Sequence, residues 1–233
     1  MPIDLSNLDS APQSVISALN NKSELFERVT DISSILRDNT IRDAVVELDM
    51  IVRKEKVLAF HFTRAFREEI ARDGLRARKT EEWRCLFIAK YQHLLKKEQI
   101  MRLKAGWSSY FTPTQKLGRD GRIFFNLTEK AYKNGSATSL LRYFGGEAIF
   151  KPFLADSDLN QILTSLGEPL IVRAAIDASS IKVFNPNAFG ITWLSTYHHS
   201  LNPNAIKQDY DVYIEKPIHP ENIISIQVVQ ELA

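Results

Sequence analysis

The sequence lacks the features that mark secreted and membrane proteins. Its single cysteine, Cys85, excludes an internal disulfide bond and fits a reducing compartment. No apolar run approaches the roughly 20 residues that a membrane-spanning helix needs. The opening stretch, MPIDLSNLDSAPQS, has neither the basic start nor the apolar core of a signal peptide. These absences predict a soluble, cytoplasmic protein without a membrane partner.

An excess of charge of one sign is also missing. The 30 basic and 28 acidic residues leave a net charge of +2, which neither demands nor excludes a nucleic-acid partner. The chain is 44% hydrophobic and 25% charged, close to an average soluble protein, and 233 residues are enough to bury a core. Without an internal repeat or a low-complexity tract, the composition predicts a globular protein and leaves its function open.

The first quarter of the chain has the apolar spacing of amphipathic helices. Between residues 13 and 52, apolar side chains recur three or four positions apart. The turn-forming residues Asp38, Asn39 and Thr40 interrupt this run and offer an N-cap to a following helix. We predict an N-terminal helical segment over residues 1–52 and a second domain over residues 53–233.

From Lys56 onward the apolar period drops to two. This alternation predicts a strand that ends at Thr63, which can cap a short helix closed by Gly74. A basic helix is predicted next, over residues 80–104, and the segments GWSSYFTP and GRDGR after it are predicted to be a loop and a turn. Further strands follow at 123–128, 169–177, 210–215 and 222–229. The pattern predicts an α+β fold with a mostly antiparallel sheet, helices inserted between the strands, and the helical segment at the N-terminus.

Two sites carry polar residues in unusual places. His61 and Thr63 share one face at the end of an apolar strand, where they either contact a ligand or serve as a structural histidine and a helix cap. Glu147 follows Gly145 and Gly146, which permit a close backbone approach. The alternative for these glycines is a helix C-cap followed by an ordinary surface glutamate.

A histidine pair raises the question of a metal. His198 and His199 are adjacent, but no further ligand stands at a recognisable spacing. The pair is therefore interpreted as part of a polar loop, and the sequence predicts no metal site.

The strand ending in His-Phe-Thr resembles a known family when it is taken with two other segments. These are the helix that closes in DGL and the terminal strand in PENIISI. Together they resemble the ADP-ribosyltransferase fold, and are most similar to DarT-type toxins and their relatives. The resemblance covers roughly residues 55 to 231 in element order.

The resemblance implies a split sheet that binds NAD as a substrate and transfers ADP-ribose as nicotinamide leaves. His61 would contact a ribose hydroxyl, and Thr63 with the backbone of Phe62 would hold the nicotinamide amide. Tyr110 would stack on the nicotinamide ring, and Arg76 would neutralise the pyrophosphate. The alternatives are a core position for Tyr110 and a solvated Arg76.

The transition state implied by the resemblance is an oxocarbenium-like sugar, which requires a nearby carboxylate. In the family this acid usually opens the penultimate strand, and that register points to Asp211. Aspartate reaches about one methylene less than the usual glutamate. Glu147 has the right side chain but precedes that strand. We favour Glu147 and keep Asp211 as the rival.

The resemblance also implies the biological setting: a toxin, an effector or a phage-defence enzyme. Its acceptor would be a protein or a nucleic acid, an inhibitor or antitoxin protein would be a partner, and an effector would act in a host cytoplasm. Two other functions stay open. One is an RNA phosphotransferase-like enzyme of the same fold, and the other is a non-catalytic binding module.

Overall fold

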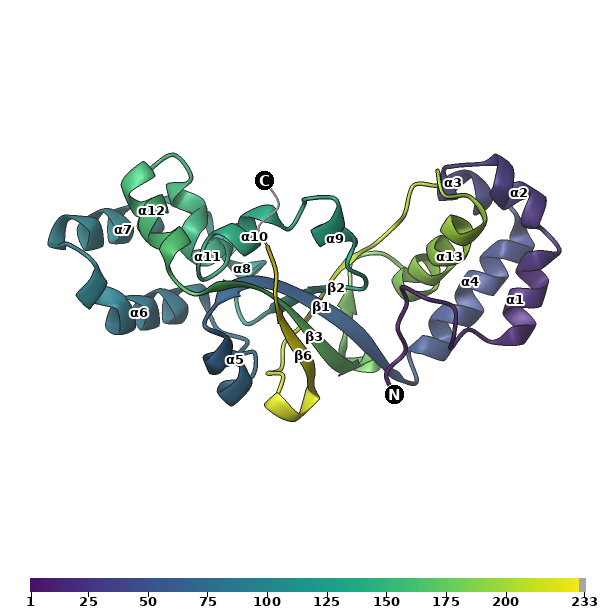
Figure 1. Ribbon diagram of the computed structural model, residues 1–233, viewed down its shortest axis with the longest axis horizontal. Coiled ribbons are helices and arrows are strands. Elements are labelled where there is room, and N and C mark those ends of the chain that lie inside the picture. The colour runs from purple at the N-terminus through teal and green to yellow at the C-terminus, as the bar shows by residue number, and fades with distance from the viewer. Residues whose placement is uncertain (231–233) are drawn as a thin grey trace. The chain divides into compact units, whose positions relative to one another are not determined.

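Six strands form one sheet in the computed structural model, which describes residues 1–230 (Figure 1). The strand order is β4-β5-β2-β1-β3-β6. Phe60 of β1 lies opposite Asn126 of β2, and Lys182 of β4 lies opposite Tyr213 of β5, both in antiparallel register. The strands are β1 (Lys56–Ala65), β2 (Ile123–Asn126), β3 (Glu168–Asp177), β4 (Lys182–Val183), β5 (Asp211–Ile214) and β6 (Ile223–Val228). The predicted α+β class with a mostly antiparallel sheet is confirmed.

Thirteen α-helices accompany the sheet in the described part of the chain, and no helix there is long and apolar enough to cross a membrane. The helices that begin before residue 100 are α1 (Gln13–Asn20), α2 (Ser23–Arg28), α3 (Ile32–Ile35), α4 (Asn39–Val52), α5 (Arg67–Asp73), α6 (Thr80–Tyr91) and α7 (Lys97–Tyr110). The others are α8 (Pro113–Leu117), α9 (Lys130–Lys133), α10 (Thr138–Arg142), α11 (Glu147–Phe150), α12 (Ser157–Ser165) and α13 (Ala188–Leu201). Short 3-10 helices are η1 (Gln92–Leu94), η2 (Lys151–Phe153), η3 (Ala178–Ser180) and η4 (Pro220–Asn222).

The chain divides into two compact units that each combine distant stretches. Unit 1 consists of residues 1–61, 124–134 and 173–213, and unit 2 contains the remainder. The predicted N-terminal helical segment, residues 1–52, lies within unit 1. The boundary between residues 52 and 53 stays a prediction, and the last three residues of the predicted 53–233 domain lie outside the described residues.

The helices of unit 1 pack through α4 and α13. Gly190 lies so close to α4 that an added Cβ would be 2.1 Å from the Val45 carbonyl oxygen. The buried carboxylate of Asp49 accepts hydrogen bonds from the Phe189 and Gly190 amides, at 3.1 and 3.3 Å. Since Asn187, the N-cap of α13, supplies no side-chain cap, Asp49 caps this helix from α4.

Unit 2 is organised around an aromatic core. Phe87 and Tyr91 of α6, Trp107 of α7 and Phe144 pack together with ring centroids 5.2 to 6.1 Å apart. The indole of Trp107 donates a hydrogen bond to the Ile149 carbonyl at 2.9 Å, so the polar atom of this buried ring is paired. These contacts join α6 and α7 to α11.

Several local predictions are confirmed. The strand predicted from Lys56 is β1, Gly74 ends α5 with φ 71°, and the Asp38 carboxylate caps α4 by accepting from the Ile41 amide at 3.3 Å. The cap proposed for Thr63 is wrong, because β1 continues to Ala65 and α5 begins after Phe66 without a side-chain cap.

Two other local predictions are also wrong. The single basic helix predicted over 80–104 is divided into α6 and α7, and the second of these continues to Tyr110 through a stretch predicted as loop. His198 and His199 lie in α13 and not in a polar loop. His198 is fully buried, and its Nε2 lies 2.7 Å from the Val29 carbonyl oxygen.

Candidate functional site

Glu147 opens α11 directly after a glycine turn in unit 2. Gly145 and Gly146 have φ values of 84° and 72°, which favour glycine over any residue with a Cβ. The indole Nε1 of Trp83 donates a hydrogen bond to the Gly145 carbonyl at 2.7 Å and ties the turn to α6. The glycines therefore lead into a helix rather than ending one, since α10 ends at Arg142 with Tyr143 as its C-cap.

Both carboxylate oxygens of Glu147 are held by cations. Arg119 donates to Oε2 from Nε and Nη2, at 3.0 and 2.6 Å, and Lys151 donates to Oε1 at 2.7 Å. Burial raises the pKa of Glu147, but the hydrogen bonds from Lys151 and Arg119 outweigh it and leave the pKa below its usual value. The side chain is 37% exposed. Glu147 is thus an ionised carboxylate with a fixed orientation and access to solvent.

A second carboxylate in the same neighbourhood also binds one arginine and one lysine, both through a single oxygen. Glu81 accepts from Arg84 Nη1 at 3.0 Å and from Lys116 Nζ at 2.7 Å. The buried ring of Phe111 lies between the two groups, with Arg119 Cζ 4.9 Å and Arg84 Cζ 5.5 Å from its centroid. We define the Glu147 network as these linked side chains: Glu81, Arg84, Phe111, Lys116, Arg119, Glu147 and Lys151.

The Glu147 network is richer in cations than in carboxylates. Each of its two carboxylates faces two cationic side chains. Arg84 is only 3% exposed, and its Nη2 has no hydrogen-bond partner within the described chain. The network therefore has a positive balance and an unused buried donor, both of which favour an anionic ligand.

Tyr110 is the predicted site residue that the structure brings close to the Glu147 network. Its ring meets the Phe111 ring edge-on, with centroids 4.9 Å apart, and it is 44% exposed. The core position considered for Tyr110 is therefore wrong. Phe62 and Thr63 are both buried in β1, and Arg76 is exposed, so none of these three belongs to the network.

His61 belongs to unit 1, where β1 pairs with β2. Its Nδ1 lies 2.8 Å from the Phe124 carbonyl oxygen. Because a carbonyl oxygen only accepts, Nδ1 carries the proton and Nε2 keeps a lone pair. Loss of hydration lowers the pKa of His61 more than the Phe124 hydrogen bond raises it. The imidazole is thus neutral at pH 7 and can accept a hydrogen bond from a hydroxyl group.

Asp211, the rival carboxylate, lies on the other face of these strands of unit 1. Asn126 donates from Nδ2 to Asp211 Oδ1 at 2.9 Å, and Asn126 shares the face of its partner Phe60. His61, the next residue along β1, points to the opposite face and contacts the Phe125 ring, with centroids 5.6 Å apart. The sheet therefore does not bring His61 and Asp211 together.

The face of Asp211 carries a row of aromatic rings that the sequence did not reveal. Tyr213 lies between Phe124 and Phe184, with ring centroids 5.7 and 5.4 Å away. Phe184 is 59% exposed and Phe124 is 36% exposed. We call these three residues the aromatic strip. The exposed rings of Phe124 and Phe184 offer stacking surfaces to a planar ligand.

Sequence reasoning missed most partners of Glu147. Lys151 had a visible signal, because a glutamate four residues before a lysine on a helix forms an ion pair. Arg119 lies in the segment GRDGR, which the sequence predicts to be a turn. It precedes Glu147 by 28 positions along the chain. Its position depends on tertiary contacts with Phe111, so no local pattern announces it.

Neither a metal site nor a known related protein identifies the chemistry of this site. Within residues 1–230, no group of three or more His, Cys, Asp or Glu side chains is arranged to hold a metal ion. Comparisons of this chain with models of protein families, with curated proteins and with solved structures give no match.

Proposed function

We propose that this chain is an NAD-dependent ADP-ribosyltransferase of toxin, effector or phage-defence type, which transfers ADP-ribose to a protein or nucleic-acid target. The observation that carries the proposal is Glu147, an ionised and oriented carboxylate on a close-approach glycine turn. As nicotinamide leaves NAD, positive charge develops on the ribose, and a fixed carboxylate stabilises it. The ADP-ribosyltransferase type of the sheet is part of the same proposal.

The charge of the Glu147 network supports NAD as the substrate. The pyrophosphate of NAD carries two negative charges, and the network offers two cations for each carboxylate. Arg119 or Lys151 contacts a phosphate oxygen while the other keeps Glu147 oriented. The exposed ring of Tyr110, placed beside Phe111, stacks on a flat heterocycle such as nicotinamide.

The roles of the other predicted residues stay predictions. His61 has the lone pair that a ribose hydroxyl needs, and Phe62, Thr63 and Arg76 keep their predicted contacts with the nicotinamide amide and the pyrophosphate. Asp211 remains the rival acid, although it lies on the sheet face opposite to His61.

Nicotinamide release at saturating NAD tests this proposal. We expect Glu147→Gln, which keeps the size of the side chain, to slow release by about 10²- to 10³-fold, the usual cost of losing a preorganised group aimed at transition-state charge. Glu129→Gln is the matched control, since Glu129 also faces an arginine and a lysine but lies outside the Glu147 network. It and Asp211→Asn should retain most of the activity.

Two outcomes would overturn the assignment. Normal turnover by Glu147→Gln together with loss of turnover in Asp211→Asn would transfer the role to Asp211. Absence of nicotinamide release by the wild-type chain with any acceptor mixture would reject the transferase. Melting temperatures of all variants show whether a loss of activity comes from unfolding.

A second candidate function, a non-catalytic binding module, is favoured by the aromatic strip. Its three neighbouring rings, two of them exposed, form an apolar patch of the kind that marks a ligand-binding surface. In this case, Phe184→Ala would abolish ligand binding while Glu147→Gln would leave it unchanged, and the opposite pattern would reject the module. Quenching of intrinsic fluorescence by NAD and by 2′-phosphorylated RNA distinguishes the ligands.

A further inference from the structure

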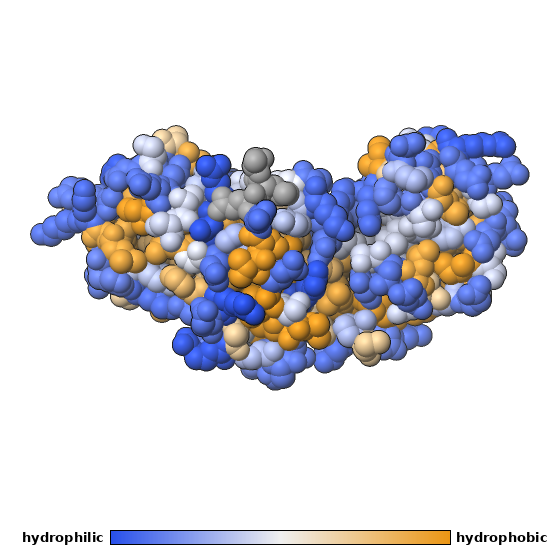
Figure 2. All heavy atoms as spheres, in the orientation of Figure 1, coloured by the Kyte–Doolittle hydropathy of each residue, from blue (hydrophilic) through white to orange (hydrophobic). Residues whose placement is uncertain are grey.

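Within residues 1–230, the outer edge of β6 in unit 2 has no strand partner. β6 is the last strand in the sheet order and lies next to β3. In the described chain, no backbone hydrogen bond outside the sheet ladder involves Ile224 to Val228. Figure 2 shows apolar side chains gathered over this strand, where Ile224 is 55% exposed and Val228 is 44% exposed. Such an edge is a template for a further strand.

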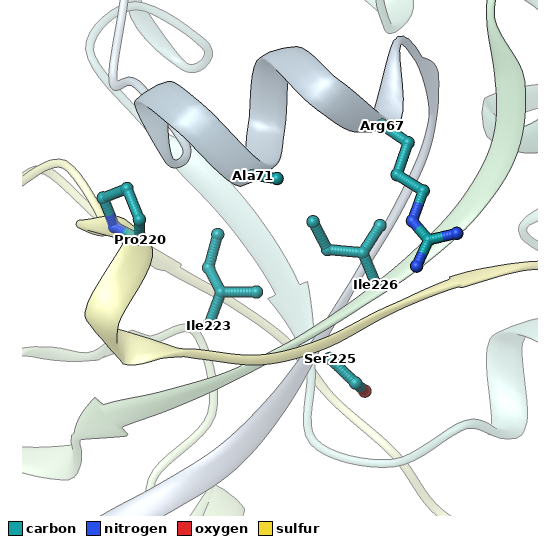
Figure 3. Close-up of a pocket in the computed structure, with 6 residues that line it drawn as sticks. All are labelled: Arg67, Ala71, Pro220, Ile223, Ser225 and Ile226. Atoms are coloured by element: carbon teal, nitrogen blue, oxygen red, sulfur yellow. The ribbon is translucent and has the colours of Figure 1, made fainter.

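A groove runs between β6 and α5. It has a volume of about 240 Å³ and is lined by Arg67 and Ala71 of α5, Pro220 of η4, and Ile223, Ser225 and Ile226 of β6 (Figure 3). An engineered cavity of about 150 Å³ holds one benzene molecule. The groove is therefore large enough for one aliphatic side chain and a carboxylate, and too small for a dinucleotide.

The walls of this groove are fixed before any ligand arrives. Leu75, just after α5, and Ile218, just before η4, exchange backbone hydrogen bonds of 2.9 Å in both directions. Gly74 permits this approach, because an added Cβ would lie 2.0 Å from the Ile218 carbonyl oxygen. Preformed walls reduce the entropy that a ligand loses on binding.

Arg67 supplies the polar end of the groove. Its guanidinium extends from the start of α5 toward Ile226, whereas the Ser225 side chain points away from α5 (Figure 3). Arg67 is exposed and has no partner in the described chain, in contrast to Arg72 on the same helix, which pairs with Asp73 at 2.7 Å. An unpaired guanidinium beside an apolar groove matches a carboxylate attached to an aliphatic group.

We propose that this groove binds the C-terminal end of an extended peptide from a partner protein. The peptide backbone pairs with the free edge of β6, its last aliphatic side chain enters the groove between Ala71 and Ile223, and its terminal carboxylate binds Arg67. Each part uses a separate feature: the edge binds the backbone, the groove selects the side chain, and the arginine selects the chain end. The proposal is independent of the transferase chemistry of Glu147.

Fluorescence anisotropy with a labelled hexapeptide tests the proposal. The probe alternates threonine and valine, ends in leucine with a free carboxylate, and carries fluorescein at its N-terminus. We expect saturable binding to the full chain, weakened about 10- to 100-fold by Arg67→Gln, the range of one lost charge-assisted hydrogen bond. The C-terminal amide of the same peptide should be weakened equally. Arg72→Gln is the matched control and should bind normally.

Further variants separate the remaining parts of the proposal. Ala71→Trp fills the groove from an exposed helix position and should abolish binding without unfolding the chain. A probe with proline in place of each threonine cannot donate at those positions and should bind weakly. The proposal is overturned if the amide binds as well as the acid, if free leucine competes as well as the peptide, or if the wild-type chain shows no saturable binding.

Discussion

Asp49 of α4 is a buried carboxylate that caps α13, so its replacement by alanine should be costly. Its side chain is 3% exposed and accepts from the Phe189 and Gly190 amides, at 3.1 and 3.3 Å, and from Arg53 Nε at 2.6 Å. Loss of a helix cap costs about 1–2 kcal/mol. Each buried donor that stays unpaired costs about 1–3 kcal/mol, although the two effects overlap here. We expect Asp49→Ala to lose about 2–4 kcal/mol of unfolding free energy.

Asp49→Asn separates the cap from the charge. The amide oxygen can still accept from the start of α13, but the pair with Arg53 and the favourable charge at the helix N-terminus are lost, so we expect about 1–2 kcal/mol. Asp43→Ala, an exposed change on the same helix, should stay within about 0.5 kcal/mol of wild type. Urea unfolding followed by circular dichroism measures all three. If Asp49→Ala and Asp43→Ala unfold at the same urea concentration, the trans cap contributes nothing and the reasoning is refuted.

Two further predictions concern buried polar groups. Burial raises the pKa of Asp209 to about 6, even though hydrogen bonds from Thr128, Tyr210 and Leu127 lower it. Since this pKa exceeds the ordinary value of 3.8, the folded state binds the proton of Asp209 more tightly than the unfolded state does. The contribution of Asp209 to the free energy of unfolding therefore falls as pH rises from about 4 to 6, and it is constant above pH 6. The pKa shift corresponds to at most about 3 kcal/mol of unfolding free energy. Asp209→Asn should remove this pH dependence when urea unfolding is measured at several pH values. A pH profile like that of wild type would refute the assignment to Asp209. Tyr91→Phe removes a buried hydroxyl that lacks a partner in the described chain, so its melting temperature should equal or exceed that of wild type. Tyr197→Phe is the control, because the Tyr197 hydroxyl donates to Asn20 at 2.7 Å and its loss should lower the melting temperature.

The sequence predicts those elements whose signals are local. β1 is visible because its apolar residues alternate without interruption, and Gly74 marks the end of α5. The break between α6 and α7 is not visible, because residues 92–96 contain neither glycine nor proline. A tertiary contact stabilises the new helix start: Gln99 accepts from the Lys96 amide at 2.7 Å and donates to Asp158 at 3.0 Å. That last contact spans 59 positions.

The candidate site likewise combines residues that have a local sequence signal with residues whose position depends on tertiary contacts. Gly145 and Gly146 identify Glu147 because a left-handed turn before a carboxylate has a sequence signature. The Phe111 ring that links Arg119 to Arg84 has none, since packing decides which aromatic residue meets which cation. The strand face of Asp211 was likewise hidden, because the facing of a short strand depends on its register with β2.

The capping of α13 by Asp49 has a consequence for synthesis of the chain. The carboxylate and the Phe189 amide are 140 positions apart, so α4 leaves the ribosome long before the helix that covers it. At about 5–20 residues per second, the delay is roughly 7 to 28 s. During that time the apolar stripe of Val45, Leu48 and Val52 has no α13 to pack against. We therefore expect the nascent chain to bind chaperones that hold exposed apolar helices, and we expect a product that terminates before α13 to keep that exposure.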